Sequence, residues 1–198
     1  ALSSAASDVY KRQKHGDIII TAHQPAGIFY GIQTLLQMLP PEIKNSQKQK
    51  GIDWTVPCAD ITDKPQFAWR GLMLDVSRHW FTKEEVKKYI DELAEYKMNV
   101  FHWHLTDDQG WRLEIKSLPR LTEVGAWRAP RVGQWWQRTP QQPGEETTYG
   151  GFYTQEDVKE VLAYAAERYV RVIPEIDVPG HSLAALVAYP DLALSLIH

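Results

Sequence analysis

The sequence predicts an α/β fold in which a parallel sheet follows a small α+β unit. Three short apolar segments, residues 72–76, 99–105 and 170–176, have the pattern of buried strands. Amphipathic helical patterns separate them, and strands that alternate with helices pair in parallel through right-handed crossovers. The stretch before residue 65 has a different pattern, so we treat it separately.

Residues 1–64 are expected to form part of a small α+β domain. The β-branched run at 17–21 predicts a strand, and apolar residues at helical spacing over 28–39 predict a helix that two prolines end. The alternation at 52–56 predicts a second, half-buried strand. Asp63-Lys64-Pro65 then breaks the pattern, because proline lacks an amide for pairing. We place the domain boundary between residues 64 and 65.

Residues 65–198 are expected to begin a (β/α)8 TIM barrel. Thr82 can cap the first helix with Glu85 completing a capping box, and Thr154 opens the second helix. An open doubly wound sheet is the alternative, but no glycine-rich turn follows the first strand. Polar and aromatic residues follow all three strands, as at the active face of a barrel. A complete barrel takes about 250 residues, so we expect about three strands here, in a partial chain.

Composition excludes several classes of function. The 22 Lys and Arg against 25 Asp and Glu give a formal charge of −3, so nucleic acid is not an expected partner. Apolar runs fall short of the roughly 18 residues of a membrane span, and no signal peptide is recognisable. Cys58 is alone, which excludes an intramolecular disulfide and a cysteine zinc cluster. Eight Trp and nine Tyr suit sugar faces as well as cores.

Arginine and aromatic residues form two candidate binding elements. Ser77-Arg78-His79 follows the first strand and Arg70 stands at its start; an arginine fork can grip two hydroxyls or a carboxylate. The alternative is a salt bridge inside the barrel. The loop 127–153 carries Trp135, Trp136 and further aromatic rings, which either stack on sugars or cover the core beneath the loop.

The second strand carries a histidine pair. His102 and His104 lie two apart and therefore point to the same side, so both could ligate a metal as in barrel metallohydrolases. Alternatively they form hydrogen bonds inside the barrel, while Asp107 and Asp108 face the site at the strand's carboxyl end. An aspartate beside an imidazole fixes its tautomer and raises its basicity.

The third strand ends in Glu175, Asp177 and His181. Retaining glycosidases hold two carboxyls about 5 to 5.5 Å apart, but Glu175 and Asp177 are neighbours on one side of a strand and diverge little. We therefore do not assign them as a catalytic pair, and we expect Glu175 to form ion pairs in the barrel. His181 follows a Pro-Gly turn that would direct it over the barrel mouth.

Together these segments resemble the family-20 glycoside hydrolases, the β-N-acetylhexosaminidases. The resemblance runs from about residue 26 to residue 193. It is carried by segments 27–37, 69–79, 102–111, 149–154 and 174–181, in that order.

The resemblance implies exo-hydrolysis of terminal β-linked N-acetylglucosamine or N-acetylgalactosamine from glycans or glycoconjugates. In that family the substrate's own acetamido oxygen attacks the anomeric carbon, a glutamate acts as acid and then base, and no metal or cofactor is required. By the same resemblance Arg70 holds the ring hydroxyls, while Asp107 and His181 hydrogen-bond towards the acid glutamate. It also implies export to a periplasm or out of the cell. No oligomeric state is implied.

The sequence lacks parts of the family pattern, namely the catalytic motif of the fourth strand and the aromatic pocket that later strands carry. The family's His-x-Gly-Gly-Asp-Glu motif belongs to the fourth strand, and this sequence stops at His198 before reaching it. We therefore expect the 198 residues alone to orient a sugar without hydrolysing it. Two alternatives are a metal-dependent barrel hydrolase that uses His102 and His104, and a noncatalytic carbohydrate-binding fragment.

Overall fold

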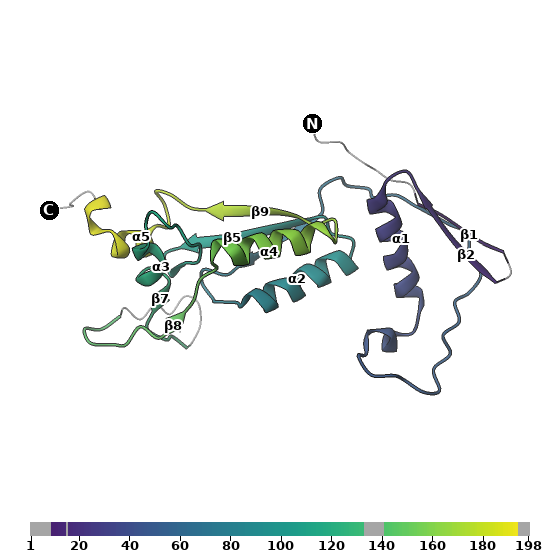
Figure 1. The fold of residues 1–198 in the computed structure, drawn as a ribbon, viewed down its shortest axis with the longest axis horizontal. Helices are drawn as coiled ribbons and strands as arrows, with labels where there is room; N and C mark the ends of the chain where they lie inside the picture. The colour runs from purple at the N-terminus through teal and green to yellow at the C-terminus, as the bar shows by residue number, and fades with distance from the viewer. Residues whose placement is uncertain (1–8, 15, 133–140, 194–198) are drawn as a thin grey trace.

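The computed structural model describes residues 9–14, 16–132 and 141–193. Its first sheet is antiparallel and has the strand order β2-β1-β3. Helix α1 packs on this sheet (Figure 1), and a 3-10 turn follows it. These elements are β1 (Val9–Lys14), β2 (Asp17–Ala22), α1 (Pro25–Met38), η1 (Pro41–Lys44) and β3 (Ile61–Asp63).

The strand predicted at residues 52–56 is wrong. That segment lies outside the helices and strands, and the third strand of the sheet is β3 instead. Asp53 explains part of the difference, because its Oδ1 accepts a hydrogen bond from the amide of Thr55 at 3.1 Å. Such a local bond competes with strand pairing.

The second sheet confirms the predicted fold class. Strands β4 (Gly71–Asp75), β5 (Val100–Asp107) and β9 (Arg171–Ile176) are parallel, with β5 in the middle. The short β6 (Gly110–Trp111) turns back antiparallel to the end of β5. Three parallel strands joined by helical crossovers form the beginning of a (β/α)8 barrel.

Helices α2 (Lys83–Glu95) and α4 (Gln155–Ala166) lie side by side on one face of this sheet (Figure 1). Each begins with a capping box: Thr82 with Glu85, as predicted, and Thr154 with Asp157. The caps satisfy amides that the first helical turn leaves unpaired. They therefore fix where each crossover helix begins.

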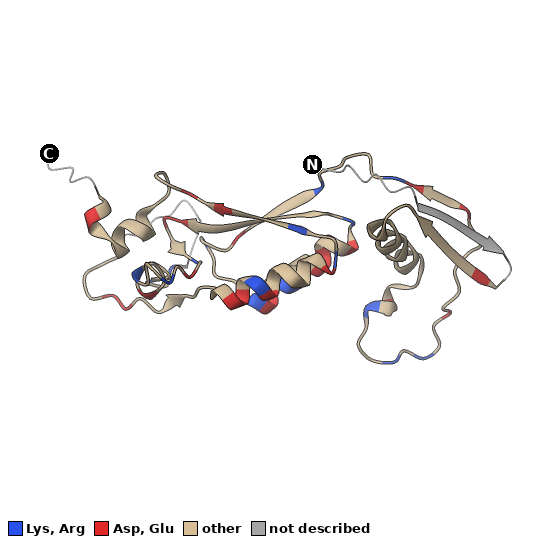
Figure 2. Cartoon of the chain, turned by 45° about the horizontal axis from the view of Figure 1, so that its top comes forward, with Lys and Arg blue, Asp and Glu red and all other residues tan. Residues whose placement is uncertain are grey.

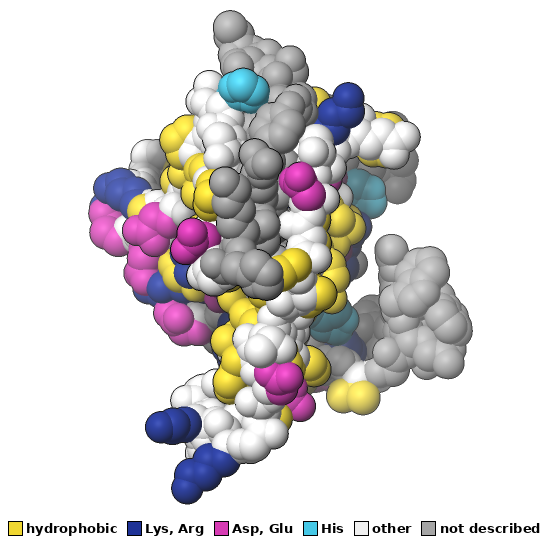
Figure 3. Space-filling model, turned by 90° about the vertical axis from the view of Figure 1, so that its right-hand side faces the viewer, with side chains coloured by type: hydrophobic (Ala, Val, Ile, Leu, Met, Phe, Trp, Pro, Cys, Tyr) yellow, Lys and Arg dark blue, Asp and Glu magenta, His cyan; other side chains and the backbone are white. Residues whose placement is uncertain are grey.

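The helices bury an apolar face on the sheet and expose a charged one. The core between them includes Val86, Ile90, Phe101, Trp103 and Val161. The outer surface of α2 and α4 alternates in charge (Figure 2) and carries ion pairs across the two helices. Viewed from the end that carries β1 and β2, charged side chains gather on one side of the molecule, with hydrophobic side chains exposed beside them (Figure 3).

Short elements follow the carboxyl ends of β5 and β9 and surround that end of the sheet (Figure 1). None of the described helices is long and apolar enough to cross a membrane. These short elements are α3 (Arg120–Glu123), β7 (Trp127–Arg128), β8 (Tyr149–Gly150), α5 (Leu183–Ala188) and η2 (Pro190–Leu192).

Candidate active site

A row of charged residues crosses the sheet near its carboxyl end. The parallel register places Asp75 beside His104 and His104 beside Glu175. Residues opposite one another in a sheet project to the same face, so these three side chains meet. Glu175 Oε2 lies 2.8 Å from His104 Nδ1, and Asp107 Oδ2 lies 3.0 Å from His104 Nε2.

His104 is enclosed by acidic groups. Burial disfavours its charged form, but hydrogen bonds to Glu175 and Asp107 outweigh burial and raise the pKa of the imidazole. The contact also affects Glu175, because the hydrogen bond from His104 lowers the pKa of the Glu175 carboxyl group. Glu175 is therefore held ionised, so it is a poor general acid at neutral pH. This agrees with the ion pairing expected for it.

The geometry favours the hydrogen-bonded alternative for the histidine pair. His102 Nε2 contacts the same Glu175 oxygen that His104 contacts. Among the described residues, two groups of three could offer ligand atoms within 4.8 Å of one another: His104 with Asp107 and Asp177, and Asp107 with Asp108 and His181. Neither group contains both His102 and His104, so these two histidines do not form the ligand pair that the metal hypothesis requires.

Asp107 is the centre of the cluster. Its side chain is 1% exposed, and Arg78 Nη2 lies 2.7 Å from its Oδ2. His181 Nδ1 lies 3.3 Å from its other oxygen, which also accepts a hydrogen bond from the Asp108 amide at 2.7 Å. A buried carboxylate is stable only where donors and opposite charges surround it. The fold supplies these from β5, from the segment after β4 and from the loop after β9.

His181 is presented to solvent. Its side chain is 56% exposed, and its backbone has φ +51°, in the left-handed region that a non-glycine residue seldom adopts. Such a conformation persists where surrounding contacts impose it, and it is concentrated at functional sites. The structure thus brings Asp107 and His181 together, as the sequence led us to expect.

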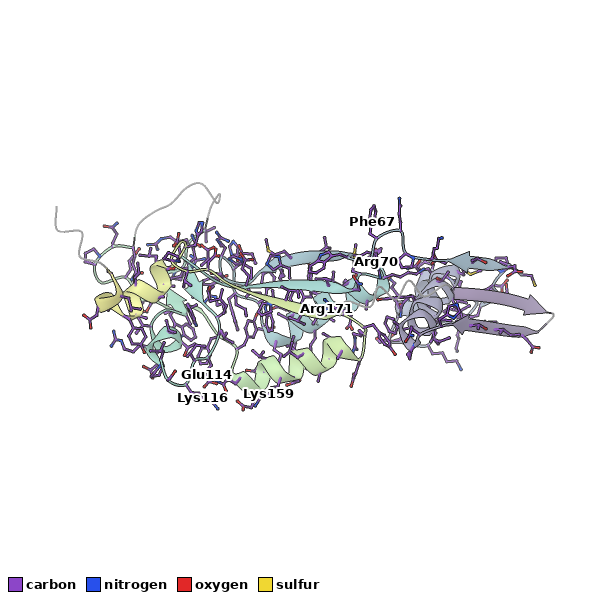
Figure 4. All side chains as sticks on the ribbon, turned by 90° about the horizontal axis from the view of Figure 1, so that it is seen from above. Phe67, Arg70, Glu114, Lys116, Lys159 and Arg171 are labelled. Atoms are coloured by element: carbon purple, nitrogen blue, oxygen red, sulfur yellow. The ribbon has the colours of Figure 1, made fainter. Side chains whose placement is uncertain are left out.

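Arg70 does not join them. It immediately precedes β4, at the opposite end of the parallel sheet. Its Nε and Nη1 donate to the carbonyl oxygens of Lys97 and Phe67, both at 2.8 Å. Figure 4 shows Arg70 near Phe67 and Arg171, at the amino ends of the strands, far from Glu114 and Lys116. The expected convergence of Arg70 with Asp107 and His181 is therefore not observed.

Arg78 occupies the place expected for Arg70. Its guanidinium contacts Asp107, and its Nη1 also donates to Asp75 Oδ2 at 2.8 Å. The side chain remains 39% exposed, so part of the fork is accessible. Arg78 is among the candidates predicted from the sequence, whereas Asp75 is not. Their position along the strand could have identified them, because Asp75 and Arg78 lie at its carboxyl end, where barrels carry active sites, and Arg70 lies at its amino end.

The aromatic loop contributes to the core as well as to the surface. Tyr153 is buried and its hydroxyl donates to the Phe81 carbonyl at 2.6 Å. Trp127 is partly exposed and its indole donates to the Thr122 carbonyl at 3.1 Å. Trp135 and Trp136 lie outside the described residues. Tyr153 thus matches the core-covering alternative for this loop.

The cluster has the composition of a binding site for a polar, uncharged ligand. Arg78 and His181 present donors beside buried carboxylates, and that combination suits hydroxyl groups, which donate and accept. The cluster lies at the carboxyl ends of the strands, where barrel enzymes carry their active sites. Fold and site therefore define the class: part of a (β/α)8 barrel with a polar cluster on its active face.

Family models identify the barrel further. Residues 67–196 match the catalytic domain of glycosyl hydrolase family 20, and residues 7–64 match domain 2 of the same family. The chain belongs to glycosyl hydrolase family 20.

Individual relatives agree with this assignment. A beta-hexosaminidase of Porphyromonas gingivalis is 50% identical over 185 residues, which are 92% of this chain and 22% of that protein. The N,N'-diacetylchitobiase of Vibrio harveyi is 40% identical and matches 93% of this chain and 20% of its own length. The chain thus spans about a fifth of these two relatives.

Solved structures share the fold. The Streptomyces plicatus N-acetyl-beta-hexosaminidase in complex with Thio-NAglucal superposes with a TM-score of 0.82 at 42% identity, covering 98% of this chain and 36% of that one. The exo beta-N-acetylglucosaminidase of Vibrio harveyi, in complex with N-acetylglucosamine, gives a TM-score of 0.79 at 42% identity. It covers 96% of this chain and 28% of that one.

Proposed function

We propose that this chain is part of an exo-acting β-N-acetylhexosaminidase that releases terminal β-linked N-acetylglucosamine or N-acetylgalactosamine. The observation that carries the proposal is the buried Asp107 carboxylate, held between Arg78 and His181 at the active face of a family-20 barrel. The names of the relatives and the N-acetylglucosamine complex of the Vibrio harveyi enzyme support it.

In the proposed reaction the substrate supplies its own nucleophile. The acetamido oxygen forms a bond to the anomeric carbon while the bond to the leaving oxygen breaks and the acid glutamate gives that oxygen its proton. Water then attacks the anomeric carbon, the bond to the acetamido oxygen breaks, and the glutamate takes the proton of the water, which gives net retention. The exposed part of the Arg78 fork binds hydroxyls of the terminal sugar, a role transferred here from Arg70. Asp107 and His181 hydrogen-bond towards the acid glutamate and tune its proton affinity. That glutamate is supplied by a fourth strand.

The same proposal includes the organisation of the chain. Residues 1–64 form part of a noncatalytic α+β domain, and residues 65–198 begin the catalytic barrel. The separate family matches to residues 7–64 and 67–196 support this division. The partners are glycans or glycoconjugates that end in N-acetylhexosamine, encountered in a periplasm or outside the cell.

The 198 residues alone are not expected to turn over substrate. Within the described part of the chain, β4 and β9 each pair only with β5, so each has one open edge. Leu72 and Met73 of β4 are also about half exposed. Open edges and uncovered apolar faces favour association or aggregation. They suit a segment that is completed by further strands.

A chromogenic N-acetyl-β-glucosaminide tests the proposal. We expect release of the chromophore by the full-length protein that contains this chain and none by the 198-residue polypeptide. Robust release by the short polypeptide would overturn the assignment of the acid to a fourth strand. Activity that chelators abolish and zinc restores would favour the metal-dependent hydrolase. A full-length protein that binds N-acetylglucosamine without cleaving the substrate would favour the noncatalytic alternative.

A further inference from the structure

Two arginines hold three consecutive carbonyl groups just after β4. Arg112 Nε donates to the Val76 carbonyl at 3.0 Å, and its Nη2 donates to the Ser77 carbonyl at 2.7 Å. Arg128 Nη2 donates to the Arg78 carbonyl at 2.9 Å. We call Arg112 and Arg128 the arginine clamp. The clamped residues lead directly to the Arg78 side chain that contacts Asp107.

The amides of the same segment are also bound. The Val76 amide donates to the His104 carbonyl at 3.2 Å. The amides of Ser77 and Arg78 both donate to Asp75 Oδ1, at 3.1 and 3.0 Å. With donors and acceptors of residues 76–78 all occupied, the segment has few alternative conformations. The backbone that carries Arg78 is therefore fixed from two sides.

Arg112 is an unusual residue to bury. Its side chain is fully buried, and burial first, then the nearby charge of Arg128, lowers its pKa to about 10. Among the described residues it forms no ion pair with a carboxylate, and its remaining bonds go to the carbonyls of Ala126 and Gly151. A buried charge without a counterion is costly. Only a set of well-placed carbonyls offsets that cost, so this cradle is built around the guanidinium.

Gly110 shows how closely the chain encloses this group. A Cβ at that position would lie 2.3 Å from the guanidinium carbon of Arg112, closer than any side chain permits. The Gly110 carbonyl also accepts a hydrogen bond from Ser77 Oγ at 2.7 Å. Gly110, the first residue of β6, therefore both leaves room for Arg112 and holds the clamped segment.

Arg128, in β7, connects the clamped segment to Tyr149 of β8. Its guanidinium lies over the Tyr149 ring, 4.7 Å from the centroid, and the Tyr149 hydroxyl accepts a hydrogen bond from the Trp80 amide at 3.1 Å. The stacked arginine and the tyrosine thus hold the segment after Arg78 as well. Within the described part of the chain, the partners of Asp107 and His181 include neither Arg128 nor Tyr149. Arg128 is instead linked to the site through the Arg78 backbone.

We propose that Arg112 and Arg128 are positioning residues that fix the backbone of residues 76–78 and thereby aim the Arg78 fork at the terminal sugar. The inference rests on the proposed function, in which Arg78 binds sugar hydroxyls. Displacing a binding group by about 1 Å can cost up to a hundredfold in rate. Loss of the clamp therefore weakens sugar binding through Arg78.

Arg128→Gln in the full-length protein is the main test, because Arg112 variants are exposed to folding failure. We expect KM for the chromogenic substrate to rise about tenfold, with partial recovery in Arg128→Lys, which keeps the charge without the planar fork.

The matched control is Arg168→Gln. Arg168 also stacks on a tyrosine, Tyr164, and donates to a carbonyl, but it lies just after α4 and pairs with Asp91 of α2, away from the cluster. Its KM should equal that of the wild type.

A double-mutant cycle with Arg78→Lys decides whether the clamp acts through Arg78. If it does, the KM increase of Arg128→Gln largely disappears in the Arg78→Lys background, since coupled residues are not additive. The proposal would be overturned if the KM increases of the two single substitutions multiplied in the double variant. A KM for Arg128→Gln within twofold of the wild type would also overturn it.

Hydrogen exchange separates failure of the clamp from failure of the proposed function. In Arg128→Gln, backbone amides at residues 77, 78 and 80 should exchange faster, while those of α2 should be unchanged. This readout requires no turnover. Faster exchange in a protein that does not cleave the substrate would retain the clamp and reject the enzymatic proposal. Unchanged exchange in an active enzyme would reject the clamp alone.

Discussion

The two ends of β4 each carry an arginine, and the two arginines differ in what they bind. Arg70, at the amino end, donates to the carbonyls of Lys97 and Phe67 and lies over the Tyr30 ring, 5.5 Å from its centroid. Arg78, at the carboxyl end, binds the carboxylates of Asp75 and Asp107. One arginine ties backbone segments together, and the other forms part of a charged cluster.

The difference shows that position along the strand predicts the role of an arginine better than residue type does. The two guanidinium groups have the same chemistry and lie eight positions apart in one segment of the sequence. In a parallel barrel, however, ligands bind at the carboxyl ends of the strands, and residues at the amino ends contribute to stability. The comparison predicts functional effects at one end and stability effects at the other.

The largest expected effect is at Asp107. Asp107→Asn keeps the shape but removes the charge that Arg78, His104 and His181 surround. In the full-length protein we expect kcat/KM to fall by about 10²–10⁴, the range typical of groups that assist proton transfer. Steady-state kinetics with a chromogenic N-acetyl-β-glucosaminide measures it. A fall of less than about threefold would contradict a central role for this carboxylate.

Substitutions of the two arginines should affect different properties, KM for Arg78 and stability for Arg70. Arg78→Lys loses the planar fork, so we expect KM to rise about tenfold to a hundredfold. Arg70→Lys loses hydrogen bonds to carbonyls, so we expect the free energy of unfolding to fall by about 1–2 kcal/mol with KM unchanged. Kinetics and chemical denaturation of both variants make the comparison. A larger KM effect for Arg70→Lys would reverse it and restore the original assignment to Arg70.

The stability contributed by His104, at the carboxyl end of the sheet, should depend on pH. Asp75, Glu175, Asp107 and Arg78 face His104, and the acidic partners raise its pKa above the ordinary value of 6.5. This contribution to stability is complete below about pH 6.5 and is lost as the pH rises through the folded-state pKa. Glu175→Gln should lower the His104 pKa and flatten this dependence. Nitrogen-15 NMR titration of the imidazole measures the pKa; an unchanged value in Glu175→Gln would contradict the pairing.

The smallest expected effects are at the helix caps. Thr82→Ala and Thr154→Ala each remove the cap of a crossover helix, so each should cost about 1 kcal/mol of stability. Both variants should retain the wild-type KM. They show whether a loss of stability alone changes sugar binding, and an increase in KM of the size seen in Arg78→Lys would weaken the comparison.

The sequence predicted those parts of the fold that depend on local pattern. Apolar runs located β4, β5 and β9, and Thr82 with Glu85 located the start of α2, because these signals act within a few residues. The predicted strand at 52–56 failed because alternation does not show whether a neighbouring strand is available. The local hydrogen bond between the Asp53 side chain and the Thr55 amide competes with strand pairing there.

For the site, the sequence predicted the meeting of Asp107 and His181 because both follow strands at the same end of the sheet. Arg70 was expected to meet them, but it lies at the amino end of β4, because the resemblance that suggested it takes no account of strand direction. The buried Arg112 gave no signal at all. Its four carbonyl partners come from segments far apart in the sequence, and carbonyl groups have no side-chain identity that a pattern could reveal.

The row of Asp75, His104 and Glu175 also protects the sheet against misalignment. If β9 slid by one residue, an apolar Ile176 or Pro174 would stand opposite His104, and Glu175 would turn to the other face. His104 would then lose one of its two carboxylate partners in a nearly solvent-free position, while Asp107 on the same strand would stay beside it, so the shift carries an electrostatic cost. The same charged row that forms the candidate site thus disfavours a one-residue shift of β9 against β5.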